Sequence, residues 1–270
     1  GINLNLIAAV NPSDVFYGVD FNPSHIANAR KVAEEAGLTN VKFFEDDFVE
    51  LAGHPPERWP QFDYIVLHGV YTWVNRDVQK ALVKFIASRL KPEGIVYISY
   101  NALPGWVAAG PTQKILYEFA KRTHGRSDER FRGAVDFLDR LKQAGAFFFN
   151  LYSSESVRID RLKKQDINYL PHEYLHDHWY LHYHMDVAND LLGAKCDYIG
   201  SATLADNIYS GLPEPFIQIL TSITDIGFRE TVRDIMVNQM FRRDVFVKGR
   251  NPMLPQEYLQ AVQKLKFCLI

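Results

Sequence analysis

The sequence predicts an α/β fold with a doubly wound parallel sheet, followed by a mostly helical second domain. Up to residue 108, short strand-like runs alternate with helical stretches of roughly a dozen residues, as in βαβ units. The strand-like runs are almost continuously apolar, which is typical of strands that helices cover on both faces. We therefore expect domains over residues 1–108 and 109–250. Residues 251–270 would be a linker or the start of a further region.

Each element of the first domain has its own local signal. Residues 2–10 carry a helical apolar pattern, and "VFYGVDF" (15–21) is a buried strand that ends in an acid. Pro23 and Ser24 start the next helix, and Gly37 ends it. The remaining elements are expected as strands at 40–48, 62–69 and 95–101, and a helix at 75–94 that closes on Pro92-Glu93-Gly94.

The second domain is expected to be helical at 112–125 and 127–146, with further helical stretches up to residue 241. "CDYIGSA" and "GLPEP" break this pattern, and "RRDVFVKG" (242–249) is predicted as a short strand. A second copy of the chain, bound through this helical region, is a candidate partner.

The composition excludes several classes of protein. With 47% hydrophobic residues in 270, the chain can bury a large core, and a formal net charge of -2 gives no electrostatic case for a nucleic-acid partner. The two cysteines, Cys196 and Cys268, form no disulfide framework, which indicates a reducing compartment. No apolar run approaches the ~20 residues of a transmembrane helix, and no signal-peptide pattern is present. We expect a cytoplasmic protein without a transmembrane segment.

The ends of the predicted strands supply the site candidates, because ligands of open α/β sheets bind beyond the carboxyl ends of the strands. Asp20, followed by Phe21, ends the first strand. A carboxylate there can accept hydrogen bonds from the two hydroxyls of a ribose; alternatively, it caps the helix that starts at Asn22. Gly1 lies nineteen positions earlier, as the last glycine of a nucleotide-binding turn would.

The second strand end carries an acidic pair. Asp46 or Asp47 can accept a hydrogen bond from an adenine amino group while Phe48 packs against the ring. The alternative is an exposed acidic turn.

The last two strand ends are aromatic. His68, Tyr71 and Trp73 would line a cleft where Gly69 allows a close backbone approach, although a histidine at such a position is more often structural. The final strand is followed by a polar, aromatic lip, or by a loop packed on the second domain. Its residues are Tyr100, Asn101, Pro104 and Trp106.

These strand-end motifs resemble those of class I S-adenosylmethionine-dependent methyltransferases. The motifs are "GVDFNPSHI", "EDDF", "FDYIVLHGVYTWV" and "LKPEGIVYISYNALPGW". Downstream, "YLPHEYL", "YIGSATLADN" and "RETVRDIMVNQMFRRDVFVKG" resemble the methyltransferase regulatory domain, which follows the catalytic fold in bacterial outer-membrane-protein lysine methyltransferases. The resemblance covers nearly all of residues 1–250. The family's first strand and most of its glycine-rich turn are absent, and we expect the protein to be longer at its start.

The resemblance implies S-adenosylmethionine as cofactor and a methyl acceptor such as a protein lysine. The cofactor-binding residues would be Gly1, Asp20, Phe21, Asp46, Asp47, Phe48, His68 and Gly69. Tyr71, Tyr100 and Trp106 would bind the acceptor, because aromatic faces suit a cationic methyl or ammonium group. His68 or Tyr71 would take a proton from the amine, and Asn101 would orient it.

His172-Glu173-Tyr174-Leu175-His176 has the HExxH spelling of a zinc hydrolase helix. Pro171 places both histidines in a first helical turn, where an i,i+4 pair is poorly held. In the family that the chain resembles, this stretch is a docking segment, so we predict no metal. "HWYLHYH" (178–184) is expected to be a contact surface.

Three other functions remain open at this stage. The chain could methylate a small molecule at nitrogen or oxygen. A nicotinamide-dependent oxidoreductase shares the acid about twenty residues after a glycine turn, although no Tyr-x-x-x-Lys pair lies near a strand end. A non-catalytic protein that binds S-adenosylmethionine and acts through its helical region is the third alternative.

Overall fold

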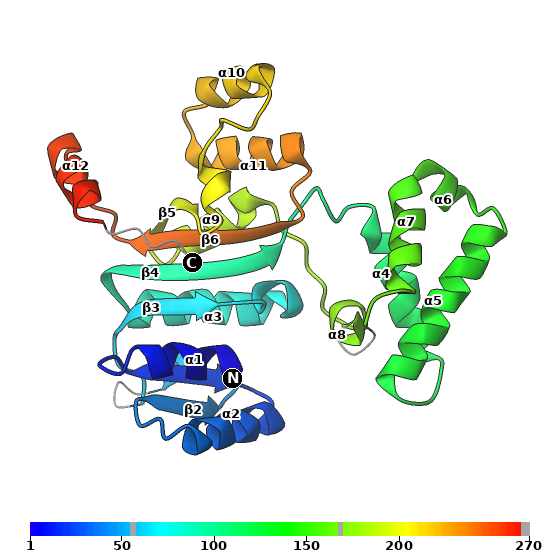
Figure 1. Cartoon of the computed structure of the whole chain (residues 1–270), viewed down its shortest axis with the longest axis horizontal. Helices are drawn as coiled ribbons and strands as arrows, with labels where there is room; N and C mark the ends of the chain where they lie inside the picture. The colour runs from blue at the N-terminus through cyan, green and yellow to red at the C-terminus, as the bar shows by residue number, and fades with distance from the viewer. Residues whose placement is uncertain (55–57, 167–169, 266–270) are drawn as a thin grey trace. The chain divides into compact units, whose positions relative to one another are not determined.

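The computed structural model describes residues 1–54, 58–166 and 170–265 and confirms the α/β class (Figure 1). It contains two compact units. Unit 1 comprises Gly1–Phe62 and Asn75–Leu90, and unit 2 comprises Asp63–Val74 and Lys91–Ile270. The predicted domain boundary at residue 108 follows a different criterion, the change from alternating to consecutive helical elements, and stays a prediction. Cys268 lies outside the described residues, while Cys196 is a buried free thiol.

Unit 1 contains a parallel pair of strands, as the apolar runs predicted. Strand β1 (Phe16–Asp20) pairs with β2 (Val41–Glu45) in a register that places Phe16 opposite Val41 and Asp20 opposite Glu45. Because both strands run in the same direction, their acidic ends meet at one edge. The backbone N–H of Asp46 donates to the carbonyl of Asp20 at 3.2 Å.

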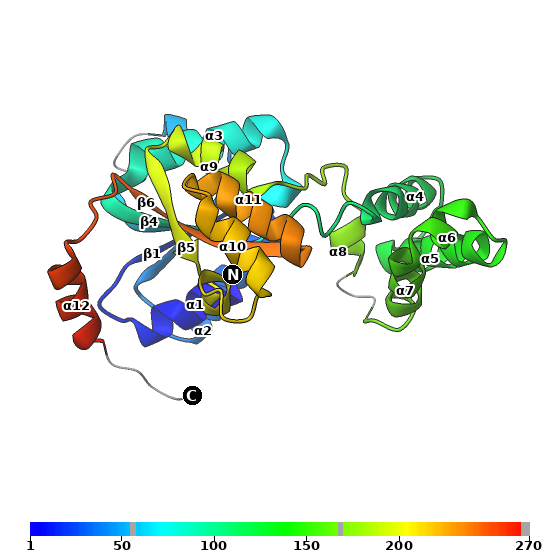
Figure 2. The same cartoon turned by 90° about the horizontal axis from the view of Figure 1, so that it is seen from above.

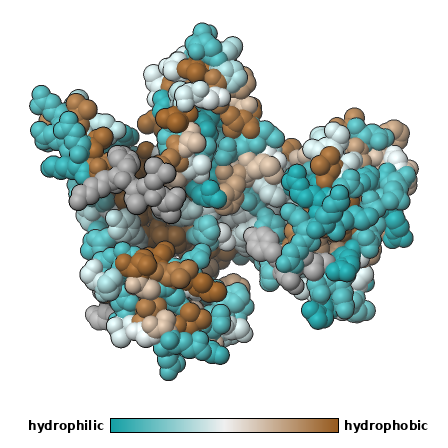
Figure 3. All heavy atoms as spheres, viewed as in Figure 1, coloured by the Kyte–Doolittle hydropathy of each residue, from teal (hydrophilic) through white to brown (hydrophobic). Residues whose placement is uncertain are grey.

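Two helices cover this strand pair. Helix α1 (Ile2–Val10) packs on α2 (Pro23–Glu35), whose first turn is capped by the Asn22 side chain. The small core beneath them consists of Ile26, Ala29, Ala33 and Phe43. The outer face of α1 is apolar and exposed, as Figure 3 shows; its residues are Ile2, Leu6, Ile7 and Val10.

Unit 1 also contains an aromatic cluster. Trp59 is 1% exposed and lies 4.8 Å from the Phe44 ring, with Tyr17 and Phe85 also in edge contact. Phe85 belongs to α3 (Arg76–Arg89), which Asn75 caps and which packs on the short helix η1 (Leu51–Gly53). The predicted helix at 75–94 therefore ends five residues early. Leu90 is fully buried and already begins the next strand.

Unit 2 contains a four-stranded sheet in the order β3-β4-β6-β5. Its strands are β3 (Phe62–Leu67), β4 (Leu90–Asn101), β5 (Cys196–Ser201) and β6 (Phe241–Lys248). The predicted short strand at 242–249 is β6, and it runs antiparallel to both β4 and β5. The sheet is therefore not purely parallel. "CDYIGSA" contains a strand and not only a break between helices, because pairing with β6 stabilises a segment whose own signal is weak.

The helical part of unit 2 surrounds a core of its own. The predicted helices at 112–125 and 127–146 correspond to α4 (Ala109–Lys121) and α5 (Ser127–Gln143). Three shorter helices complete the group: α6 (Phe147–Leu151), α7 (Ser153–Leu162) and α8 (Leu170–Tyr174). Buried side chains from α4, α5 and α7, such as Leu116, Leu138 and Ile159, meet in the middle.

The remaining elements lie along the sheet. Helix α9 (His184–Leu192) packs on β5, and α11 (Ile226–Val237) packs on α9 and on α10 (Glu214–Ser222) (Figures 1 and 2). The short helices η2 (Tyr71–Trp73) and η3 (Leu204–Asn207) follow β3 and β5, and α12 (Pro255–Gln263) follows β6. No helix in the described part of the chain combines the length and apolar character needed to cross a bilayer.

A buried ionic network joins β4, β6, α9 and α11. Arg242 of β6 donates to Asp244 at 2.9 Å, to Asp234 of α11 at 2.5 Å and to Glu230 at 2.9 Å. The carboxylate of Asp244, 0% exposed, also accepts from Tyr100 of β4 at 2.6 Å and lies 2.9 Å from Nδ1 of His184. Burial raises the pKa of Asp234 to about 7; Arg242 opposes this shift, and the neighbouring carboxylates of Asp244 and Glu230 add to it.

The helical core should respond strongly to a cavity. Replacing Leu138, 2% exposed, with alanine should lower the free energy of unfolding by about 3 kcal/mol, because both transfer free energy and packing are lost. Leu204→Ala, at a position 81% exposed, is the matched control and should change it by less than about 0.5 kcal/mol. Equal losses in chemical denaturation would contradict the assigned core.

The network should couple stability to pH. The folded-state pKa of Asp234 is raised to about 7, so its contribution is fully present below the unfolded pKa near 3.9 and is lost as pH rises through 7. The free energy of unfolding of the wild type should therefore fall relative to that of Asp234→Asn between about pH 4 and pH 7. Urea unfolding at several pH values measures this difference, and a difference independent of pH would refute the assignment.

Candidate functional site

Asp20 ends β1 with a carboxylate that is ordered yet accessible. Its Oδ1 accepts the backbone N–H of Asn22 at 2.9 Å, and its Oδ2 lies 3.0 Å from Nδ1 of His25. The side chain is 35% exposed. Helix α2 itself is capped by Asn22, whose Oδ1 accepts the N–H of Ser24. A carboxylate has about four lone-pair positions, so Asp20 retains acceptor capacity for a ligand.

The two acids after β2, Asp46 and Asp47, have different surroundings. Asp46, whose side chain is 7% exposed, pairs with Arg58 at 2.6 Å and with Nε2 of His54 at 2.9 Å. Asp47 is exposed, and its Oδ1 accepts the N–H of Val49 at 2.8 Å. Phe48 is half-buried beside it. Asp47 and Phe48 are therefore better placed than Asp46 to meet an adenine ring.

Asp46, Glu50 and His54 hold ligand atoms within 4.8 Å of one another. The spacing would suit a cation. However, Arg58 already supplies the positive charge that Asp46 needs, so we explain Asp46 and His54 as an ion-pair cluster with Arg58.

The two remaining candidates of unit 1 lie at its surface. Gly1 precedes α1, and a Cβ atom there would approach Cβ of Ala29 to 2.7 Å, so the close contact between α1 and α2 requires glycine. Phe21 is 71% exposed and is available to pack against a flat ligand.

In unit 2, His68 and Gly69 follow β3 as predicted. Gly69 has a φ angle of +65°, which favours glycine, and its N–H donates to Oγ of Ser99 at 2.9 Å. His68 is exposed, with Nδ1 3.3 Å from both the Tyr97 hydroxyl and Ser99 Oγ. An accessible imidazole at a strand end can take part in a hydrogen bond through either ring nitrogen.

Tyr71 and Tyr100 are buried, and their hydroxyls have partners in the core. Tyr71 is 0% exposed and donates to Asp190 at 2.6 Å, and Tyr100 donates to Asp244. Burial raises the pKa of Tyr100, and Asp244 adds to the shift, so this phenol stays protonated. Both hydroxyls are therefore engaged within the core, and the ring of Tyr71 packs at a tilt against His182, with ring centres 5.1 Å apart.

Asn101 is the last residue of β4, and Trp106 lies in the connection from β4 to the helical part of unit 2. The backbone N–H of Asn101 donates to Thr72 Oγ1 at 2.9 Å, and its side-chain amide donates to Glu173 at 3.4 Å. Trp106 donates to the carbonyl of Met240 at 2.8 Å, and the guanidinium of Arg158 lies 4.6 Å from its ring centre. The Trp106 side chain is therefore held by contacts within unit 2.

The histidine-rich stretch does not form one continuous helix. Helix α8 ends at Tyr174, before His176. Glu173 and His176, which the sequence analysis placed in a docking segment and not in a metal site, contact the ends of β4 and β3 through Asn101 and Trp73. The two histidines of the HExxH spelling therefore do not share one helix.

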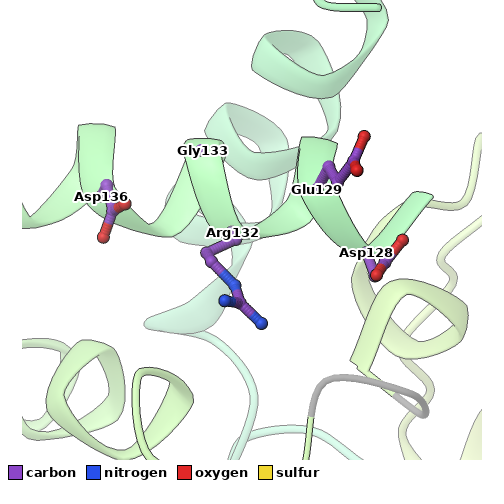
Figure 4. Close-up of a pocket in the computed structure, with 5 residues that line it drawn as sticks. All are labelled: Asp128, Glu129, Arg132, Gly133 and Asp136. Atoms are coloured by element: carbon purple, nitrogen blue, oxygen red, sulfur yellow. The ribbon is translucent and has the colours of Figure 1, made fainter. Parts of the chain in front are cut away.

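A surface hollow of about 400 Å³ lies elsewhere, on α5 (Figure 4). It is lined by Asp128, Glu129, Arg132, Gly133 and Asp136, and the side chains project from a single helix. No strand end contributes to it, so we do not assign it to the candidate site.

The family comparisons cover both parts of the sequence. Residues 1–131 match the family described as a methyltransferase domain, and residues 166–248 match the predicted methyltransferase regulatory domain. A tRNA (guanine-N(7)-)-methyltransferase of Cupriavidus metallidurans is 32% identical over 141 residues, which cover 46% of this chain and 53% of that protein.

Longer matches extend over most of the chain. An uncharacterized protein of Synechocystis sp. is 42% identical over 271 residues, which cover 100% of this chain and 53% of that protein. The structure of PKMT2 from Rickettsia typhi has a TM-score of 0.76 at 26% identity, covering 94% of this chain and 48% of that one. PKMT2 has also been solved in complex with AdoHcy. The chain thus spans about half the length of these two proteins.

The order of the strand-end motifs, the fold of both units and these matches all indicate the same family. The chain belongs to the class I S-adenosylmethionine-dependent methyltransferases that carry a methyltransferase regulatory domain.

Proposed function

We propose that the protein transfers the methyl group of S-adenosylmethionine to an amine, specifically the side chain of a protein lysine. The observation that carries cofactor binding is the accessible Asp20 carboxylate at the carboxyl end of β1. The lysine acceptor is supported by the resemblance to outer-membrane-protein lysine methyltransferases and by the similarity to PKMT2. A cytoplasmic location, supported by the cysteine content, is part of the same proposal.

The residues present suit this cofactor. Asp20 has acceptor positions left for two ribose hydroxyls, and Asn22 and His25 hold its orientation. Asp47 would accept from the adenine amino group, with Phe48 against the ring. His68 and Gly69 would border the methionine portion, where the positive φ of Gly69 leaves the backbone open.

The cofactor supplies a methyl group on a positively charged sulfonium. The nitrogen lone pair of the acceptor forms a bond to the methyl carbon, the carbon–sulfur bond breaks, and its electron pair remains on sulfur. The enzyme's main task is therefore to align the nucleophile with that bond. A lysine ammonium must first lose a proton, and the exposed imidazole of His68 is our candidate acceptor.

Asp20 should control cofactor affinity. Asp20→Ala should raise the Kd for S-adenosylmethionine by about tenfold or more, because hydrogen bonds to a charged acceptor are lost. Calorimetric titration of the full-length protein measures this. Asp14→Asn, an exposed acid in the same unit, is the control and should leave Kd unchanged. Equal affinity of wild type and Asp20→Ala would remove the main support for the proposal, and tighter binding of a nicotinamide dinucleotide would favour an oxidoreductase.

The acceptor class is testable directly. Radiolabelled S-adenosylmethionine and cell extract should yield label in the protein fraction, released as methyl-lysine on hydrolysis. Asp20→Ala should reduce that label in proportion to its weaker cofactor binding. Label confined to small molecules would contradict the lysine proposal, and cofactor binding without any transfer would indicate a non-catalytic protein.

A further inference from the structure

The segment 176–183 lies along the ends of β3 and β4 in unit 2. The N–H of Tyr180 donates to the carbonyl of Thr72 at 2.9 Å, and that of His182 donates to Asn101 at 3.2 Å. The N–H of Leu103 returns a hydrogen bond to His182 at 2.9 Å. Because these bonds involve backbone groups, the position of the segment depends little on its side chains.

This arrangement gathers four side chains, which we name the β4-end cluster: Trp73, Asn101, Glu173 and His176. His176 packs on Trp73, with ring centres 5.3 Å apart. Glu173 accepts from the Asn101 amide at 3.4 Å, and Thr72, the neighbour of Trp73, holds the Asn101 backbone. Trp73, Glu173 and His176 are all only partly buried, so they remain accessible to a ligand.

The chemistry of the cluster suits a cationic amine. It contains one carboxylate and one indole face, the two groups that bind an ammonium ion by charge-assisted hydrogen bonding and by cation–π attraction. Burial lowers the pKa of His176, and the nearby His172 and His178 act in the same direction. The imidazole therefore stays neutral near pH 7 and adds no repulsive charge.

We infer that the β4-end cluster is the amine-recognition site, in which Glu173 binds the ammonium group of the methyl acceptor and Trp73 packs against it. The inference rests on the proposed amine acceptor and goes further, because it assigns acceptor specificity to residues of the regulatory region. A purely structural Glu173 would hold Asn101 together with its other contacts in the protein. Holding the Asn101 amide needs a hydrogen-bond acceptor but no charge.

Glu173→Gln separates the two roles. Glutamine retains an oxygen that can accept from Asn101, while the negative charge is lost. We use n-butylammonium chloride as a probe of the lysine side chain and uncharged n-butanol as its control. Binding is followed through the NMR signal of ¹³C-labelled His176 in the full-length protein, identified by its loss in His176→Asn.

The wild type should bind n-butylammonium and show no comparable response to n-butanol. Glu173→Gln should weaken binding about tenfold, because one charge-assisted hydrogen bond is lost, and Glu173→Asp should restore part of it. Glu214→Gln, an exposed glutamate at the start of α10, is the matched control and should bind as the wild type does.

Unchanged binding by Glu173→Gln, or equal responses to the amine and the alcohol, would overturn the inference. Failure of the wild type to bind n-butylammonium would do the same. Because the readout needs neither cofactor nor methyl transfer, these outcomes are independent of the cofactor titration and of the radiolabel test. The proposed function can thus stand when the inference fails, and a failure of the proposed function itself would appear separately, in the cofactor titration or the radiolabel test.

Discussion

The carboxylate of Asp244 is the group on which the second unit most depends. It is completely buried, and it joins a tyrosine of β4, a histidine of α9 and an arginine that also bonds to α11. An ion buried in this way is tolerated only when its partners are all in place, so each element must occupy one position. Tyr100 immediately precedes Asn101. The network therefore holds β4 one residue before its end.

That strand end is then completed by residues far away in the sequence. Thr72 holds the Asn101 backbone from the β3 side, and His182 adds backbone hydrogen bonds from the regulatory region. Gln113 of α4 donates to the carbonyl of Tyr174, and this hydrogen bond holds the end of α8 against α4. The regulatory region is therefore part of the surface that follows β4. This arrangement explains why an acid and an aromatic ring suited to an amine arise together there.

In unit 1, the main feature is a set of acidic residues at the ends of two parallel strands. Parallel pairing of β1 and β2 brings the ends of two strands to one edge, and acidic residues stand at both. The guanidinium of Arg58 neutralises Asp46, which also contacts His54, whereas Asp20 and Asp47 keep accessible oxygens. Burial and charge partners, not the number of acids, separate the carboxylate of Asp46 from the two that remain accessible.

The sequence by itself determined the local features. Strands β1 to β4, helices α2, α4 and α5, and the place of Asp20 all follow from apolar runs, capping residues and turns, because these signals act over a few neighbouring residues. Tertiary structure decided what depends on distant partners. The β5 strand needs β6, and the hydroxyls of Tyr71 and Tyr100 bond to acids 119 and 144 positions away. Glu173 contacts Asn101 only because the chain returns to the end of β4. Closing such a long loop costs entropy, and packing elsewhere in the fold offsets that cost. A local sequence pattern therefore cannot predict this contact.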